Sequence, residues 1–357
     1  MAYELEIPKR QNRKLLYAFL AGLAIAVIVF TRADWKRLMV VLSQIEPAWA
    51  ILSLAFSAAS YLFVAAVMGS ILRIIGCSLP FRTIFEISFV STTVNYIMSL
   101  GGLSGIALKV YLLARQRISP SQTLSISIVH GFMTNTVLVL LVYAGFIYIL
   151  MHTGMTWAQM IAAVLILALA FLLTWVTVQI MLSGEFRHRL FLLGMRVLAF
   201  INRKLRGRRV VSEAKAREFY RQFDAGMRMI FTDNRKLIMP ALCAVLDWAS
   251  MILCLWGSFK CVNYSINFII LLVGFSVAVF MTIFSFTPAG LGLVEGSVAG
   301  VYFALGVPFE RALVAVAVYR LSFYILPVLI SFIFYRQFFY RERNVSPPVI
   351  SNTKIIN

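Results

Sequence analysis

Phe286 to Gly296 read Phe-Thr-Pro-Ala-Gly-Leu-Gly-Leu-Val-Glu-Gly, and this stretch interrupts a long hydrophobic segment. A proline and three glycines break a helix there, and the freed backbone groups find no water at bilayer depth. Such a break is tolerated where protein or a water-filled cavity covers it. Glu295 lies at the end of the break, and a carboxylate inside the membrane marks a candidate functional site. The stretch therefore predicts a functional site inside a membrane protein.

The composition of the whole chain supports the same prediction. Of the 357 residues, 61% are hydrophobic and only 13% are charged, and the mean hydropathy is +0.88. A soluble domain is about half apolar and about one quarter charged. At roughly 20 residues per span, the chain can supply about eight membrane segments and one loop domain. We therefore predict an all-α polytopic membrane protein.

The net charge of +19 first suggests a nucleic-acid partner, but the position of the charges argues against one. Lys and Arg gather at the N-terminus, in residues 185–236 and in the tail after Arg336, and these segments flank hydrophobic spans. This is the positive-inside pattern. It predicts a bacterial-type cytoplasmic (inner) membrane protein with both termini in the cytoplasm, and no nucleic-acid partner.

Two of the hydrophobic segments are interrupted. Residues 83–114 break at Gly101-Gly102, and residues 265–306 break at Pro288 to Gly292. Each is either a re-entrant hairpin or a pair of tilted spans, and the charge pattern is compatible with both. The predicted uninterrupted spans are 14–31, 47–73, 121–150, 157–182, 237–259 and 308–335.

The predicted topology contains an inverted repeat. One unit is span, broken hairpin and span over 47–150, and the other repeats this order over 237–335 from the opposite side. Gly102 to Pro120 and Gly290 to Pro308 are both intervals of 18 residues, at an offset of 188. Inverted repeats with broken helices are typical of secondary-transporter architecture.

We divide the chain into an N-terminal membrane half (1–182), a basic amphipathic cytoplasmic loop (183–236), a C-terminal membrane half (237–336) and a cytoplasmic tail (337–357). The loop repeats apolar residues at helical spacing among arginines, which predicts two amphipathic helices on the inner leaflet. Recruitment of anionic lipid headgroups and a plain basic loop that only sets topology remain alternatives.

Ionisable residues of both signs fall within the predicted membrane stretches. Paired around a polar cavity they suit a lipid headgroup, and the alternative is structural ion pairing that fixes the helices. The six are Glu86, Lys109, His130, Asp247, Glu295 and Arg320. Glu295 and Arg320 rank first, because helix-end amides at the break favour an anion and a guanidinium holds phosphate with two hydrogen bonds.

The first hairpin is polar before its break, which predicts a cavity wall or interhelical hydrogen bonding. Ser91 and Asn95 share one helix face there. The full set of candidate substrate-binding residues is Glu86, Asn95, Gly101, Gly102, Lys109, Asp247, Pro288, Gly290, Gly292, Glu295, Gly296 and Arg320.

Enzyme and metal signatures are missing from the sequence. There is no nucleophile elbow, Walker loop or zinc-protease motif, and the four cysteines and three histidines lack ligand spacing. We expect no catalytic residue, no metal and no cofactor.

Pro288 to Gly296, followed by Leu-Gly-Val-Pro at 305–308 and by Tyr319-Arg320, resembles the lysylphosphatidylglycerol synthase transmembrane family. That family shows Pro-Gly-Gly-Leu-Gly-x-x-Glu-Gly and a later Tyr-Arg. Gly101 to Leu113 is similar to its earlier glycine motif, which a basic residue follows. The resemblance covers most of the chain. It implies the lipid-flippase half of the bifunctional aminoacyl-phosphatidylglycerol proteins, as a stand-alone member lacking the aminoacyl-transferase domain.

The chain departs from the family pattern in three places. Ala289 replaces a glycine, His130-Gly131 lies where many relatives carry Glu-Arg, and Ile106 stands where an acidic residue is expected. The lipid therefore stays open among phospholipids, glycolipids and polyprenyl carriers.

We expect a translocase that moves an anionic phospholipid or a lipid-linked headgroup between leaflets. The alternatives are an intramembrane lipid-modifying enzyme, with Glu295 or His130 as base, and an accessory subunit or scaffold of lipid synthesis. Candidate protein partners are a second copy of the chain and a lipid-synthesis enzyme.

Overall fold

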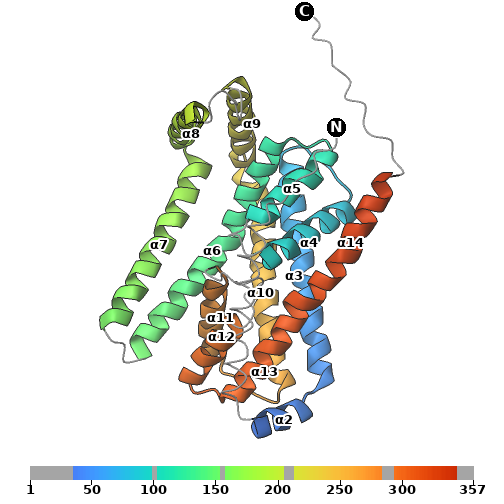
Figure 1. The fold of residues 1–357 in the computed structure, drawn as a ribbon, viewed down its shortest axis with the longest axis vertical. Helices are drawn as coiled ribbons and strands as arrows, with labels where there is room; N and C mark the ends of the chain where they lie inside the picture. The colour runs from blue at the N-terminus through green and yellow to red at the C-terminus, as the bar shows by residue number, and fades with distance from the viewer. Residues whose placement is uncertain (1–34, 99–102, 153–156, 205–212, 284–292, 344–357) are drawn as a thin grey trace, which may run out of the picture.

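The computed structural model describes residues 35–98, 103–152, 157–204, 213–283 and 293–343, and all regular structure in these ranges is helical (Figure 1). The first half contains α2 (Trp35–Ser43), α3 (Pro47–Ile74), α4 (Phe81–Met98), α5 (Leu103–Arg115), α6 (Pro120–His152) and α7 (Trp157–Leu182). Between the halves lie α8 (Gly184–Lys204) and α9 (Glu213–Phe231). The second half contains α10 (Ile238–Cys261), α11 (Phe268–Ile283), α12 (Leu293–Ala304), α13 (Phe309–Arg320) and α14 (Leu326–Arg343).

Four helical stretches of the described chain are long and apolar enough to cross a membrane. A fifth is counted if α7 and α8, which meet at a bend of 105°, form one span. The expected count of eight is not confirmed, because the interrupted segments yield helices of 12 to 18 residues, shorter than the roughly 20 residues that a span needs. The predicted span 14–31 lies outside the described residues. The four stretches are Pro47–Ile74, Pro120–Tyr148, Arg235–Cys261 and Phe309–Arg336.

Both interrupted segments consist of two helices, as the sequence predicts. In the first, α4 ends at Met98 and α5 begins at Leu103. In the second, α11 ends at Ile283 and α12 begins at Leu293. Proline explains several starts, because it is tolerated in the first turn, where its missing N–H leaves no intrahelical bond unmade. Pro47 and Pro120 each begin a long helix.

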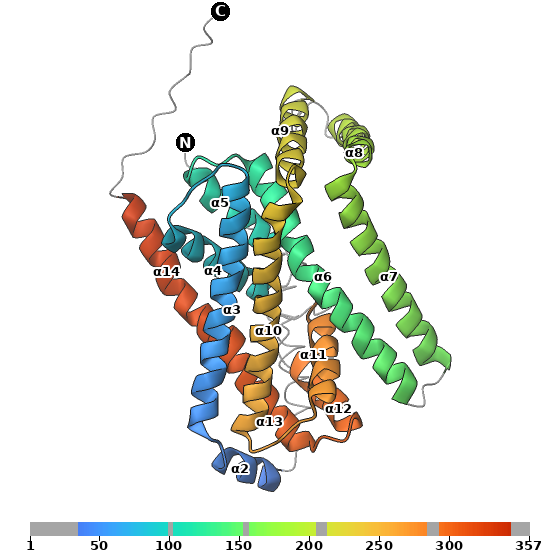
Figure 2. The same ribbon diagram turned by 180° about the vertical axis from the view of Figure 1, so that it is seen from behind.

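The two halves pack as an inverted pair. Helices α3 and α10 lie side by side and antiparallel (Figures 1 and 2). Near one end of the pair the Glu46 backbone N–H donates to the Cys261 carbonyl at 2.9 Å, and further along the Ser60 hydroxyl donates to Asp247. The other contacts are reciprocal, since α4 packs against α14 and α11 packs against α6. Each unit therefore places its broken hairpin against the last helix of the other unit.

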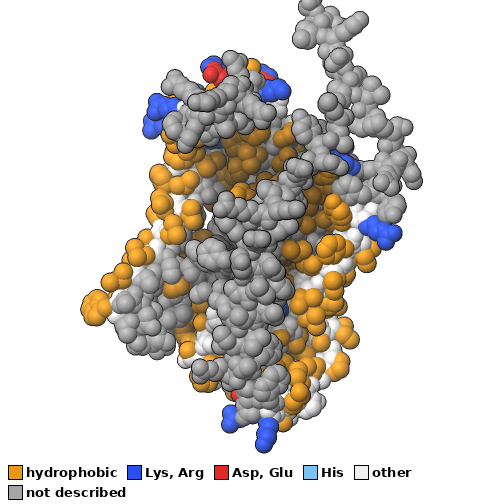
Figure 3. Space-filling view, viewed as in Figure 1, with side chains coloured by type: hydrophobic (Ala, Val, Ile, Leu, Met, Phe, Trp, Pro, Cys, Tyr) orange, Lys and Arg blue, Asp and Glu red, His pale blue; other side chains and the backbone are white. Residues whose placement is uncertain are grey.

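The outer surface of the described chain suits a lipid environment. Hydrophobic side chains cover the flanks in Figure 3, whereas most Lys and Arg side chains gather at the two ends of the molecule and beside the end of α14. Helix α7 packs mainly against α6, and it turns large apolar side chains outward, among them Leu165 and Phe171, each 64% exposed. Exposed apolar area of this extent would be costly in water.

The two amphipathic helices predicted within 185–236 are present as α8 and α9, at one end of the bundle (Figure 1). Helix α9 docks on α6, where Ser121 Oγ donates to Gln222 at 2.7 Å and Ser125 Oγ donates to the Phe223 carbonyl at 3.2 Å. Met227 is fully buried. The apolar face of α9 is therefore covered at least in part by protein.

Gly274 allows α11 and α12 to pack closely, and we expect Gly274→Ala to lower the stability of the second hairpin. A Cβ at this position would overlap the ring of Tyr302, a fully buried side chain whose hydroxyl donates to the Leu271 carbonyl at 3.0 Å. Overpacking of this kind costs about 1–3 kcal/mol. The measurement is the thermal unfolding midpoint of the detergent-solubilised protein. Gly300→Ala is the matched control, since no atom lies within 4 Å of a Cβ there. Equal midpoints for the two variants would contradict this packing.

Candidate functional site

Glu295 and Arg320 form an ion pair between α12 and α13. Arg320 Nε lies 2.9 Å from Glu295 Oε1, and the side chains are 5% and 16% exposed. Glu295 occupies the first turn of α12, where the positive end of the helix dipole favours a carboxylate. Arg320 is the last residue of α13. The structure thus brings together the two residues that the sequence ranked first.

Arg320 is followed directly by a π-helical turn, Leu321–Ile325, which joins α13 to α14. Such turns are rare and occur frequently at functional sites, since they disrupt the regular backbone bonds of a helix. The Tyr61 hydroxyl of α3 donates to the Phe323 carbonyl within the turn at 3.0 Å. This contact from the other unit stabilises the backbone that positions the guanidinium.

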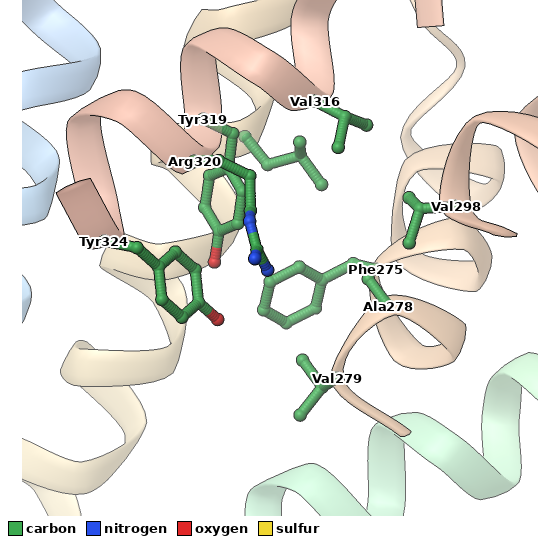
Figure 4. Close-up of a pocket in the computed structure, with 9 residues that line it drawn as sticks. Phe275, Ala278, Val279, Val298, Val316, Tyr319, Arg320 and Tyr324 are labelled. Carbon is green, nitrogen blue, oxygen red and sulfur yellow. The ribbon is translucent and has the colours of Figure 1, made fainter. Parts of the chain in front are cut away.

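Aromatic rings surround the guanidinium. Its central carbon lies 4.8 Å from the centroid of the Tyr324 ring, a cation–π distance. Tyr319 stacks on Phe323 with 5.6 Å between ring centroids, and Tyr96 of α4 lies 4.8 Å from Tyr324. Figure 4 shows Arg320 pointing between the Tyr319 and Tyr324 rings toward Phe275.

Sequence reasoning did not select these aromatic residues as a site. A signal was available for one of them, because Tyr324 lies four residues after Arg320 on one nearly continuous helix. The contributions of Tyr61 and Tyr96 come from the other unit and have no local signal.

The site is closed in this structure. The cavity beside Arg320 has a volume of ≈ 20 Å³ and is bordered by apolar side chains of α11, α12 and α13, including Phe275, Val298 and Val316 (Figure 4). That volume holds about one water molecule. A lipid headgroup is far larger than this cavity.

A second, larger cavity opens between α2 and the start of α13, at the end of the molecule away from α8 and α9 (Figure 1). Its volume is ≈ 360 Å³, and Lys36, Arg37, Glu310 and Arg311 contribute to its lining. Arg311 is fixed there by a hydrogen bond of 3.0 Å from Nη1 to the Asn263 carbonyl. The cavity offers mixed charge at one end of the bundle.

Asp247 lies at the contact between the two units. It is 4% exposed, and it accepts a hydrogen bond from the Ser60 hydroxyl. Within the described chain no Lys or Arg forms an ion pair with this carboxylate. Its neighbour Trp248 donates from Nε1 to the Thr134 carbonyl of α6 at 2.7 Å. The structure therefore places Asp247 on the surface along which α3 and α10 meet, separate from the Glu295–Arg320 pair.

The polar residues of the first hairpin serve largely local contacts. Glu86 pairs with Arg82 one turn earlier on α4, at 3.0 Å, an (i, i+4) spacing that the sequence itself contains. Asn95 Oδ1 accepts from Ser104 Oγ at 3.3 Å, which ties α4 to α5. The Ser91 hydroxyl donates to the Ile87 carbonyl of its own helix. The roles of Glu86 and Asn95 in headgroup binding stay predictions.

The remaining candidates divide into two groups. Lys109 on α5 and Gly296 in the first turn of α12 lie within the described chain. The glycine and proline positions of the two breaks lie outside the described residues: Gly101, Gly102, Pro288, Gly290 and Gly292. No group of three or more His, Cys, Asp or Glu side chains in the described ranges is arranged to hold a metal ion.

Fold and site together define an integral membrane protein built from two inverted units, with a buried ion pair between the broken hairpin and the last helix of the second unit. The model of the lysylphosphatidylglycerol synthase TM region family matches residues 16–331, so the chain belongs to this family, as the motifs predict. The chain is also similar to a UPF0104 membrane protein of Methanothermobacter thermautotrophicus. The two are 26% identical over 115 residues, which is 32% of this chain and 33% of that relative.

Proposed function

We propose that the protein moves a lipid headgroup between the two leaflets of a bacterial-type inner membrane. The observation that carries the proposal is the Glu295–Arg320 pair, buried inside a membrane protein and surrounded by tyrosine rings. Ionisable groups within a membrane are costly, and they mark substrate or ion pathways. The pair offers a carboxylate for an amine or hydroxyl and a guanidinium for a phosphate, which matches a phospholipid or lipid-linked headgroup.

The inverted arrangement supports movement rather than static binding. Two inverted units can exchange their conformations, so that a site between them opens first to one side of the membrane and then to the other. This exchange is the usual basis of alternating access. In the closed state Glu295 neutralises Arg320. An arriving phosphate would replace the carboxylate on the guanidinium, and the released Glu295 carboxylate would accept from an amine or hydroxyl of the headgroup, so that both buried charges keep a partner. The π-helical turn after Arg320 supplies a backbone that is easier to rearrange than a regular helix.

The charge distribution supports one orientation. Basic residues concentrate on α8 and α9, at the opposite end from the larger cavity between α2 and α13. By the positive-inside rule, α8 and α9 lie in the cytoplasm and this cavity opens to the other side.

Reconstitution into vesicles tests the function. The purified protein is incorporated with headgroup-labelled phosphatidylglycerol, phosphatidylethanolamine or a glycolipid, and the accessibility of the label from outside is followed over time. We expect protein-dependent movement of at least one lipid, and its loss in Glu295→Gln. Mass spectrometry of the recovered lipid is the control for chemistry. A lipid of altered mass would contradict translocation and favour a lipid-modifying enzyme. No movement of any lipid by folded protein would overturn the proposal.

A further inference from the structure

A second basic site lies in the first unit, where α5 packs against α6. Lys109 of α5 is half-buried. His130 of α6 is 7% exposed, and its Nδ1 is buried without a hydrogen-bond partner. The two side chains are close enough to interact electrostatically. Neither is bonded to the Glu295–Arg320 pair, which lies on α12 and α13 of the other unit.

A third polar group belongs to the same helix face. Ser127 lies three residues before His130 on α6, and this spacing places the two side chains on one side of the helix. Ser127 is also 7% exposed, and its hydroxyl has no hydrogen-bond partner. Buried polar groups are nearly always satisfied, so an imidazole nitrogen and a hydroxyl left open on one helix face, with a lysine on the adjoining helix, indicate a missing ligand.

Among the described helices around Lys109, no acidic residue supplies the counter-charge. Helices α5 and α6 contain no Asp or Glu, and neither do α3, α7 and α11, which pack against α6. Over the described chain, the buried carboxylates on the other neighbouring helices are all engaged elsewhere. Glu86 pairs with Arg82, Asp224 pairs with Arg187 and Arg228, and Asp247 accepts from Ser60.

A half-buried lysine with no carboxylate partner on the adjoining described helices favours an external anion that neutralises it. The surrounding donors are all suited to phosphate oxygens: three N–H groups of Lys109, an imidazole N–H of His130 and the hydroxyl of Ser127. The site lies between helices of the membrane part of the chain, where the phosphates within reach are those of lipids.

We propose that Lys109, His130 and Ser127 form a second phosphate-binding subsite, which holds the phosphodiester of a membrane phospholipid within the first unit. The subsite deepens the proposed function and rests on it for the direction of movement. A headgroup would occupy this subsite in one unit and the Glu295–Arg320 site in the other.

Nitrogen-15 NMR of the histidine side chains tests the subsite without a transport measurement. The chain has only three histidines, so His130→Gln assigns the resonance. The full-length protein in detergent is titrated with dioctanoylphosphatidylglycerol, with dioctanoylglycerol and with inorganic phosphate. We expect a saturable shift of the His130 resonance with the phospholipid and none with the neutral diacylglycerol. Lys109→Gln should weaken the binding about 10- to 100-fold, the usual loss for a charge-assisted hydrogen bond.

The matched controls are His188→Gln, a histidine that packs beside Tyr220 between α8 and α9, and Lys260→Gln, a lysine bonded to Ser265 at the end of α10. Both should bind the phospholipid like the wild type. The unfolding midpoint gives a second readout. Lys109→Met should unfold at a higher temperature than the lipid-free wild type, because it removes an uncompensated charge, whereas a structural role predicts a lower midpoint.

Each outcome has a definite meaning. A shift with inorganic phosphate and none with phospholipid keeps the anion site but assigns it to a water-soluble phosphate. No shift with either probe, or unchanged binding in Lys109→Gln, overturns the subsite. Lipid movement that persists unchanged in Lys109→Gln would leave the proposed function standing and remove only the subsite. Phospholipid binding at His130 without any lipid movement would leave the subsite standing and contradict the proposed function.

Discussion

Replacing Arg320 with methionine is expected to abolish lipid movement and to destabilise the protein by about 3–5 kcal/mol, the usual cost of removing one partner from a buried ion pair. The substitution leaves the Glu295 carboxylate, which is 16% exposed, without its guanidinium. It also removes the cation that lies over the Tyr324 ring. The measurements are the unfolding midpoint in detergent and the rate of lipid movement in vesicles.

A double substitution separates a structural pair from a substrate site. Glu295→Gln combined with Arg320→Met removes both charges, so the penalty for an unpaired buried charge disappears and stability should largely return. If the pair only fixes α12 against α13, lipid movement should return as well. We expect movement to remain absent, because the phosphate has lost its guanidinium. Recovery of wild-type movement in the double variant would rule out Arg320 as a headgroup ligand.

Arg187→Ala is expected to have the second-largest effect, a loss of about 3–5 kcal/mol from the docking of α8 and α9 onto the bundle. The Arg187 side chain is 4% exposed, and it bonds Asp224 of α9 from Nε at 2.7 Å and from Nη2 at 2.6 Å. Its Nη1 donates to the Ile180 and Met181 carbonyls at the end of α7, at 3.0 and 2.9 Å. One guanidinium thus joins three helices.

Trypsin cleavage within α8 and α9 measures this docking, and it should accelerate in Arg187→Ala. Arg187→Lys should rescue little, since an ammonium cannot reproduce the planar fork of a guanidinium. Arg189→Ala is the matched control, because Arg189 pairs with Glu185 while both are largely exposed, and such pairs contribute about 0–1 kcal/mol. Equal cleavage rates for Arg187→Ala and Arg189→Ala would show that the buried pair does not hold these helices.

Local chemistry explains why the sequence predicted the long helices well. The predicted span 47–73 is the helix Pro47–Ile74, and 157–182 is Trp157–Leu182. Apolar length and a proline at the first position act within one segment, so they can be recognised in the sequence of that segment without knowledge of the helices that pack against it. The interruption of both hairpins is equally local, because glycine and proline disfavour a helix wherever they stand.

The count of membrane segments was less well predicted, and the reason is also physical. Hydropathy measures how apolar a stretch is, but the short helices α5 and α12 have 13 and 12 residues and do not by length alone cross a bilayer. Whether a broken hairpin spans depends on the helices that cover it. That information lies in other parts of the chain.

The sequence by itself determined an all-helical membrane protein, the positions of its breaks, its amphipathic pair of helices and the small set of ionisable residues at its centre. Only the tertiary structure decided which of these residues meet. It pairs Arg320 with Glu295, sets Asp247 against Ser60, and brings Lys109 within electrostatic reach of His130, with no carboxylate bonded to it among the described residues. These partners are up to 187 residues apart in sequence. Their meeting depends on the inverted packing of two units, a long-range arrangement that no local pattern encodes.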